Sequence, residues 1–236
     1  MIPFRDENPS RTVPWVTRGL VALNIAFFAF ELWLGQDLDR FIQNAAVVPS
    51  LVAGRNLALE PSDFVRSLAP NQLFRFVASM FLHGGPMHLL GNMLYLWVFG
   101  DNVEDRLGHG WFLGFYLLCG AVASWAHILS APSSALPSIG ASGAIAGVLG
   151  AYVMFFPRAR VVTFLPLGFF YRIVKVPAVW FLGFWFLTQF LSGALAPATA
   201  AAAGGGVAWW AHIGGFACGL LIAAVAGPAK ADSRNG

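Results

Sequence analysis

Charged side chains are scarce in this sequence. They make up 11% of the 236 residues, whereas a soluble domain carries roughly 25%. Hydrophobic residues account for 58% of the chain and aromatic residues for 15%. This balance excludes an ordinary soluble protein and indicates a chain that lies in a membrane.

Cysteine is nearly absent, and no internal repeat is visible. The two cysteines, Cys119 and Cys218, both fall within apolar runs, so we expect buried small residues and no disulfide. The missing repeat weakens a transporter built from inverted halves. The chain also lacks the HExxH helical pattern, and no cysteine or carboxylate accompanies its histidines, which disfavours a zinc site.

Long apolar runs dominate what is present. A run of about 20 residues crosses a hydrocarbon layer of about 30 Å as a helix, and the sequence predicts six such spans. The expected spans are approximately 18–34, 87–99, 111–129, 142–156, 177–195 and 207–226. The second and fourth are short, which indicates either local thinning of the bilayer or helix ends that open into a water-filled cavity, and the cavity fits an enzyme better. The predicted fold is therefore an all-α bundle of six transmembrane helices.

The distribution of positive charge predicts the orientation. No cleavable signal peptide is apparent, because the N-terminus is polar and the first apolar run is long. With the N-terminus inside, the inner segments hold ten of the fourteen Lys and Arg residues, as the positive-inside rule requires. We therefore expect a cytoplasmic tail over 1–17, a six-helix domain over 18–227 and a second cytoplasmic tail over 228–236. The compact core favours a bacterial inner membrane.

Two connections have distinct character. The segment from Gly35 to about Pro86 mixes charged and apolar residues, so it is expected to form a long, structured outer loop with short interfacial helices. The segment over 156–177 is basic and aromatic, which is typical of a segment resting on an anionic inner leaflet. We interpret it as an anchor and not as a nucleic-acid site.

Few polar side chains lie at membrane depth, where they are costly and usually functional. They are His88, Asn92, Ser142 and His212, with His83 just outside. All fall in the outward half of their spans. His88 and Asn92 are four residues apart, so they share one helix face.

Small residues follow both Ser142 and His212. Ala146 and Gly150 stand four and eight residues after Ser142, and Gly215 and Gly219 stand three and seven after His212. Such stripes permit close helix approach in membranes. The helix carrying Ser142 is therefore predicted to pack against the helix carrying His212.

This constellation suits acyl transfer. A serine hydroxyl needs a neighbouring base, which His212 can supply, and the oxyanion needs donors, which Asn92, His88 and the Ser142 N–H can supply. No carboxylate lies at that depth, so the arrangement is a dyad and not a triad. Glu31, near the outer end of its span, is expected to snorkel to the interface.

Four motifs carry a resemblance that extends over nearly the whole chain. They are "GASGAIAG", "AHIGGFACG", "HGGPMHLLGN" and "DNVEDRLGHG". In these motifs the sequence resembles the rhomboid family of intramembrane serine proteases. The resemblance implies that Ser142 is the nucleophile and His212 the general base, with His88 and Asn92 flanking the oxyanion site.

The resemblance also implies supporting residues. These are Gly140 and Gly143 around the serine, Gly215 and Gly219 after the histidine, His83 in the loop above the site, Glu104 with Arg106 at helix ends, and Arg75 of a Phe74-Arg75 pair that replaces the family's Trp-Arg. Ala146 stands where some members carry a tyrosine that stacks on the histidine. The orientation of His212 is then expected to come from elsewhere, with Trp209 and Trp210 as candidates.

The implied activity is hydrolysis of a peptide bond in or near a transmembrane helix of a membrane-protein substrate. Because backbone in lipid is protected by its own hydrogen bonds, the substrate must unwind locally. Trp185 and Phe181 of the fifth span are hypothesised to gate entry. The expected partners are transmembrane substrates and the lipid bilayer, with no cofactor, metal or nucleic acid.

A catalytically silent rhomboid-like protein that binds transmembrane helices is the main alternative, although such proteins are expected to lack the serine or the histidine. A polar-solute channel is disfavoured because no polar residues continue the path inward. His88 and Asn92 could instead cross-link helices, and His127 and His109 are expected to be interfacial and solvated.

Overall fold

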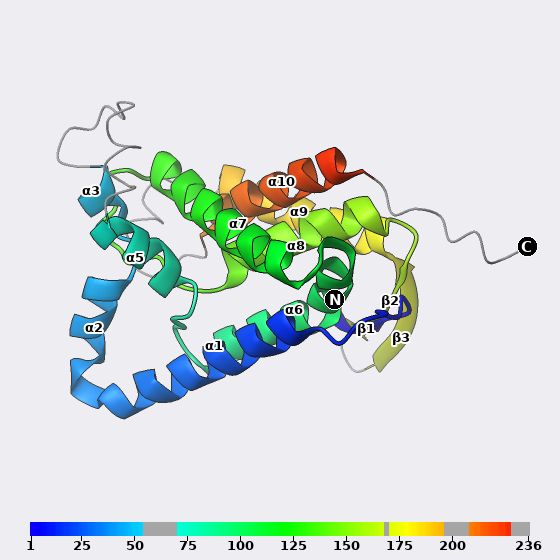
Figure 1. Ribbon diagram of the computed structural model, residues 1–236, viewed down its shortest axis with the longest axis horizontal. Coiled ribbons are helices and arrows are strands. Elements are labelled where there is room, and N and C mark those ends of the chain that lie inside the picture. Colours follow the sequence, from blue (N-terminus) through cyan, green and yellow to red (C-terminus); the bar gives the residue numbers. More distant parts are fainter. Residues whose placement is uncertain (54–69, 168–169, 196–207, 228–236) are drawn as a thin grey trace, which may run out of the picture.

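The computed structural model describes residues 1–53, 70–167, 170–195 and 208–227, and most of them are helical (Figure 1). A 3-10 turn, η1 (Gly35–Asp37), joins the first two helices. The helices are α1 (Trp15–Leu34), α2 (Leu38–Ala45), α3 (Pro49–Val52), α5 (Pro70–Ser79), α6 (Pro86–Leu107), α7 (His109–Ser130), α8 (Ser142–Phe155), α9 (Ala178–Leu195) and α10 (Trp209–Ala226).

Several helices are long and apolar enough to cross a membrane. Among the described residues, four segments qualify: Trp15–Ala45, α7, α9 and α10. α8 is apolar but has only 14 residues, and α6 has 22 residues but ends in the charged run from Asp101 to Arg106. The chain is a multi-pass membrane protein, and the count of six spans stays a prediction.

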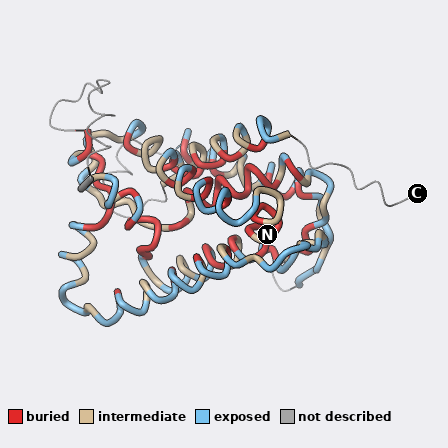
Figure 2. The backbone as a smooth tube through the Cα atoms, viewed as in Figure 1, coloured by how far each residue is buried: buried red, intermediate tan, exposed pale blue. Residues whose placement is uncertain are grey.

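α8 is the centre of the bundle. It is buried along nearly its whole length (Figure 2) and contacts α6, α7, α9 and α10. A helix that is apolar on all sides is suited to such a position. The polar groups of α8 lie near its two ends, with Ser142 as its first residue and Tyr152 in its last turn.

Glycines bring α8 and α10 into backbone contact. A Cβ added at Gly215 would stand 2.0 Å from the carbonyl oxygen of Gly143, and one at Gly150 would stand 2.1 Å from that of Phe216. The contacting stripe on α8 therefore includes Gly150, as the sequence pattern predicts, and also Gly143, which the pattern did not name. Ala146 is fully buried.

A small antiparallel sheet corrects the expectation of an all-α chain. Its strands are β1 (Ile2–Asp6), β2 (Arg160–Leu167) and β3 (Phe170–Pro177), in the order β1-β2-β3. The β2–β3 hairpin occupies the basic, aromatic segment, which is rich in β-branched and aromatic residues that favour strands. We call the end of the bundle that carries these three strands the sheet end (Figure 1).

The sheet brings the N-terminal segment to the connection between α8 and α9. Ile2 pairs with Phe164 and Asp6 with Val161. The segment expected as a tail over 1–17 thus contains β1 and the first residues of α1. The C-terminal tail expected over 228–236 lies outside the described residues.

The described part of the long connection after α1 forms the short elements η1, α2, α3 and α5. Arg75 on α5 holds α5 to the C-terminal end of α2, because its Nη1 donates to the carbonyl oxygens of Gln43 and Ala46, each at 2.9 Å. A β-bridge between Val47 and Ser138 links this region to the segment before α8. Residues 54–69 of the expected loop lie outside the described part.

The two cysteines are both free. Their Sγ atoms are 3.8 Å apart, with Cys119 buried on α7 and Cys218 half-buried on α10. Both thiols are free, as predicted, but only Cys119 is buried as expected.

Candidate active site

Ser142 and His212 meet where α8 and α10 begin. The Oγ of Ser142 lies 2.8 Å from the Nε2 of His212, which is within reach for proton transfer between a nucleophile and its base. His212 is only 8% exposed. The backbone contact between the two helices sets this separation, because no side chain stands between them at Gly143 and Gly215.

The second ring nitrogen of His212 also has a partner. Its Nδ1 lies 2.7 Å from the Oε1 of Gln189 on α9. The Trp185 ring lies 5.8 Å from the His212 ring, and Trp209 meets it edge-on at 6.4 Å. The sequence reasoning named Trp209 and Trp210 and missed Gln189, although an amide within an otherwise apolar span was a signal that could have found it.

Gly140 connects the serine to the residues of α6. Its φ is +123°, and an added Cβ would stand 2.8 Å from the His88 ring and 3.7 Å from the Nδ2 of Asn92. Glycine is therefore required here both by the backbone conformation and by the space. His88 and Asn92 thus lie beside the residue two positions before Ser142.

Unsatisfied donors gather at this point. The Nδ2 of Asn92 is buried and has no hydrogen-bond partner among the described residues. Ser142 opens α8, where the first N–H groups have no acceptor inside the helix and Ala141 provides no side-chain cap. A buried donor without a partner is costly, so this geometry suits an acceptor that arrives with the substrate.

The loop before α6 is held by a buried carboxylate. The backbone N–H of His83 donates to both oxygens of Glu31, at 3.0 and 3.2 Å. Glu31 is 2% exposed, so the expectation that it snorkels to the interface is wrong. It lies on α1 and fixes the loop that leads to His88.

His83 packs against His88 in this loop, with ring centroids 5.2 Å apart. Burial lowers the pKa of His83 to about 4, so the ring is neutral at pH 7. A neutral ring beside His88 suits a packing role. In the described part of the chain, no three His, Cys, Asp or Glu side chains lie close enough to hold a metal ion.

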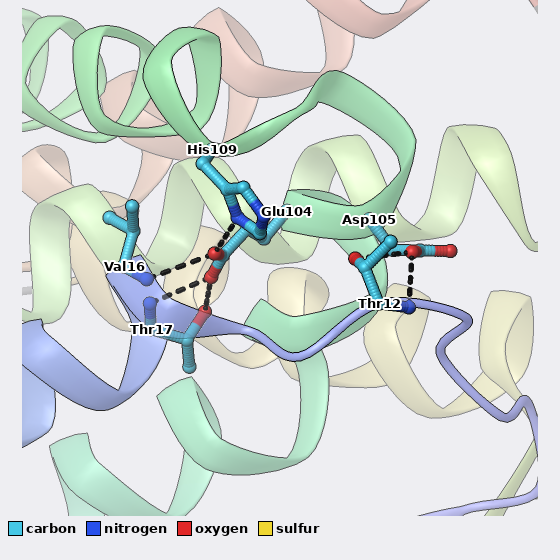
Figure 3. Close-up of polar contacts among 6 residues, drawn as sticks. All are labelled: Thr12, Val16, Thr17, Glu104, Asp105 and His109. Atoms are coloured by element: carbon cyan, nitrogen blue, oxygen red, sulfur yellow. Dashed lines mark hydrogen bonds and ion pairs between the residues drawn. The ribbon is translucent and has the colours of Figure 1, made fainter.

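Glu104 joins three helices at the opposite end of α6 (Figure 3). Its fully buried carboxylate accepts from the N–H of Val16 at 2.9 Å and from the N–H and hydroxyl of Thr17, both at 2.7 Å. The Nδ1 of His109 lies 2.5 Å from the same carboxylate, so His109 is a bonded residue at the start of α7 and not simply a solvated one.

Arg106 adds a contact near Glu104. Its Nη2 donates to the carbonyl oxygen of Gly227 at 3.3 Å, and its guanidinium lies 5.3 Å from the centre of the Phe155 ring. Glu104 and Arg106 therefore hold helix ends together, at a distance from Ser142. His127 is half-buried in the last turn of α7.

A small cavity lies beside Ser142. Its volume is about 20 Å³, and its lining includes the hydroxyl residues Ser79, Ser124 and Ser138. A polar cavity of roughly 10–15 Å³ is large enough for one water molecule. The cavity therefore offers a place for a water next to the serine.

A family model described as Rhomboid domain matches residues 70–229. Rhomboid protein 1, mitochondrial, from Saccharomyces cerevisiae is 31% identical over 150 residues, which cover 62% of this chain and 38% of the yeast protein. Presenilin-associated rhomboid-like protein, mitochondrial, from Bos taurus is 34% identical over 152 residues, covering 63% and 35% of the two chains.

A bacterial protein is also similar. Rhomboid protease GluP from Bacillus subtilis is 43% identical over 84 residues, which cover 36% of this chain and 16% of GluP. The aligned regions thus span well under two thirds of these relatives. The Rhomboid domain match, by contrast, takes in more than half of this chain, including α6, α8 and α10 with the four polar residues that they bring together. The chain belongs to the rhomboid family.

Proposed function

We propose that this protein is an intramembrane serine endopeptidase that hydrolyses peptide bonds in or near transmembrane helices of membrane-protein substrates. The observation that carries the proposal is the 2.8 Å contact between the Oγ of Ser142 and the Nε2 of His212. The similarity to a relative named as a protease supports it.

In the acylation step, the Oγ of Ser142 attacks the carbonyl carbon of the scissile bond while the Nε2 of His212 takes the hydroxyl proton. The carbonyl oxygen becomes an oxyanion. The free Nδ2–H of Asn92, the His88 ring and the N–H groups at the start of α8 are the donors proposed to stabilise it. His212 then returns its proton to the leaving amine, and the acyl group stays on Ser142.

In the deacylation step, a water molecule attacks the ester. His212 takes a proton from that water and later gives it to the Oγ of Ser142, which leaves as the hydroxyl. The product is a carboxylic acid. The hydroxyl-lined cavity beside Ser142 is the proposed source of this water.

The proposed substrates are helices that unwind locally before attack, because a helical peptide bond in lipid is already hydrogen-bonded. Helix-weakening residues near the cleavage site and a small residue before the cut are expected. The proposed orientation places both termini in the cytoplasm and the site toward the outer face. The relatives include mitochondrial and bacterial proteins, so they do not support the bacterial inner membrane over others.

The test uses purified protein in liposomes with a model transmembrane substrate that has a helix-breaking segment near its outer end. Wild type is compared with Ser142→Ala and His212→Ala, and thermal unfolding reports folding. Cleavage by wild type alone supports the proposal. Cleavage that survives Ser142→Ala rejects the nucleophile, and a folded wild type that binds the helix without cleaving it favours the silent helix-binding alternative.

A further inference from the structure

A histidine acts as a base through one nitrogen only when the other carries the proton. The Nε2 of His212 faces Ser142 at 2.8 Å, so this nitrogen must hold the free lone pair and Nδ1 the hydrogen. Which tautomer forms depends on the partner of the second nitrogen. That partner is Gln189, whose Oε1 lies 2.7 Å from Nδ1.

The orientation of the Gln189 amide follows from its other contact. The hydroxyl of Thr188 donates to the carbonyl oxygen of Trp185 at 2.6 Å. Since that hydrogen is used, the Thr188 oxygen accepts from the Nε2 of Gln189, 3.3 Å away. The amide NH₂ therefore faces Thr188 and the amide oxygen faces His212, which is the arrangement that accepts a hydrogen from Nδ1.

Burial strengthens the hydrogen bond between Gln189 and His212. Gln189 is 9% exposed and His212 is 8% exposed, so little water competes for either group, and a hydrogen bond in a low dielectric is stronger than in water. The Trp185 ring, which lies on α9 with Gln189, is 5.8 Å from the His212 ring and covers that ring. In the described part of the chain, no carboxylate is hydrogen-bonded to His212.

We propose that Gln189 is a positioning residue for catalysis, which fixes the tautomer and ring orientation of His212 through its amide oxygen. The proposal rests on the proposed protease function. With Gln189 included, the Ser142–His212 dyad becomes a hydrogen-bonded chain of three residues, Ser142–His212–Gln189, whose third member is neutral. Such a group orients the ring without supplying the negative charge that an aspartate would place there.

This hydrogen-bonded chain of residues also links three helices. Ser142 lies on α8, His212 on α10 and Gln189 on α9. Any displacement of α9 away from α10 separates Gln189 from Nδ1 and releases the histidine. Catalysis therefore requires that α9 be packed on α10 when the serine attacks.

The experiment measures kcat and KM for a transmembrane substrate, and the rate at which a small fluorophosphonate labels Ser142. Gln189→Met removes the acceptor at similar size, Gln189→Glu keeps an acceptor oxygen in its place, and Leu187→Met is the matched control on the exposed side of α9. We expect Gln189→Met to lower kcat and the labelling rate about 10- to 100-fold with little change in KM. Gln189→Glu should recover most of that loss.

Thr188→Val supplies a second test, because it keeps Gln189 but removes the hydroxyl that orients the Gln189 amide. We expect a smaller loss of kcat than for Gln189→Met. A Gln189→Met rate equal to that of Leu187→Met overturns the proposal. So does an effect on KM alone, or a Gln189→Glu rate as low as that of Gln189→Met. A folded wild type that neither cleaves nor labels would instead reject the protease function on which the proposal rests.

Discussion

Gly219 of α10 lies directly on Gly147 of α8. A Cβ added at Gly219 would stand 1.9 Å from the carbonyl oxygen of Gly147, a separation that no side chain can occupy. Gly219 follows His212 by seven residues and Gly147 follows Ser142 by five. The contact therefore fixes the spacing of the two helices that carry the proposed nucleophile and base.

Gly219→Ala should push α10 away from α8. Since the clash is with backbone, we expect a loss of about 1–3 kcal/mol in stability and a clear loss of fluorophosphonate labelling. Gly114→Ala is the matched control, because Gly114 lies within α7 with nothing within 4 Å of an added Cβ. Unfolding in mixed micelles measures both variants, and equal stability of the two would contradict the packing argument.

Asn92→Ala should remove one proposed donor to the oxyanion. The expected result is a decrease in kcat of roughly 10²–10³-fold, with KM nearly unchanged, because the interaction forms only in the transition state. The substitution also deletes a buried donor that has no partner in the described part of the chain, so thermal stability should not fall. A variant with full kcat would remove Asn92 from the oxyanion site.

Glu104→Gln should destabilise the bundle without touching the site. The carboxylate accepts from Val16, Thr17 and His109, and an amide would turn donor hydrogens toward some of these donors. A loss of about 2–4 kcal/mol is expected for this buried group. Asp105→Asn is the control, because the half-buried Asp105 makes a similar pair of contacts to the exposed Thr12, and its loss should cost under about 1 kcal/mol. Equal losses would contradict the role of burial.

The sheet end should weaken as pH rises through 6. Burial raises the pKa of the Asp6 carboxyl to about 6, the charge of Asp101 adds to this, and the hydrogen bond from Tyr152 opposes it. The folded protein then holds this proton more tightly than the unfolded chain, so the stabilisation is present below about pH 4 and is lost as pH rises through 6.

Asp6→Asn tests this pH dependence, because an asparagine keeps an acceptor oxygen for Tyr152 but does not titrate. Thermal unfolding midpoints of wild type and variant are compared from about pH 4 to about pH 8, which brackets the pKa values of the unfolded and folded states. The wild-type midpoint should fall relative to that of the variant as pH increases. Parallel curves would show that Asp6 does not titrate in this range.

The two residues of the hypothesised gate, Phe181 and Trp185, contact different helices. Phe181 is buried against α6, with its ring 6.1 Å from that of Phe99 and 6.5 Å from that of Tyr95, whereas Trp185 contacts His212 and Phe216 on α10. Phe181→Val should loosen α9 from α6 and raise turnover of a transmembrane substrate, with labelling by a small phosphonate unchanged. Lower turnover in a folded variant would count against the gate.

The proposed site was largely predictable because its residues are polar in apolar surroundings. Ser142, His212, His88 and Asn92 stand out for that reason alone. The structure places His212 against Ser142, and His88 and Asn92 beside Gly140. Gln189 carries the same signal but lies in the span treated only as a gate. Glu31 was misjudged because a sequence gives depth in the membrane but not the direction of a side chain.

The sheet was missed for a different reason. The segment over 156–177 has aromatic and basic residues that suit either a membrane surface or a strand, and strand pairing is set by partners far away in the sequence. β2 pairs with its neighbour β3 on one side, but its other partner is β1, which lies more than 150 residues earlier in the chain. No local sequence pattern predicts the pairing of β1 with β2.

The pairing of β1 with β2 also orders the assembly of the protein during synthesis. Ile2 is synthesised before its partner Phe164, which emerges only after α1, α6, α7 and α8 have been translated. Residues 2–6 therefore remain unpaired with β2 until these helices have been made. Their closure over the hairpin is a late event in biogenesis, since contacts between distant residues form slowly.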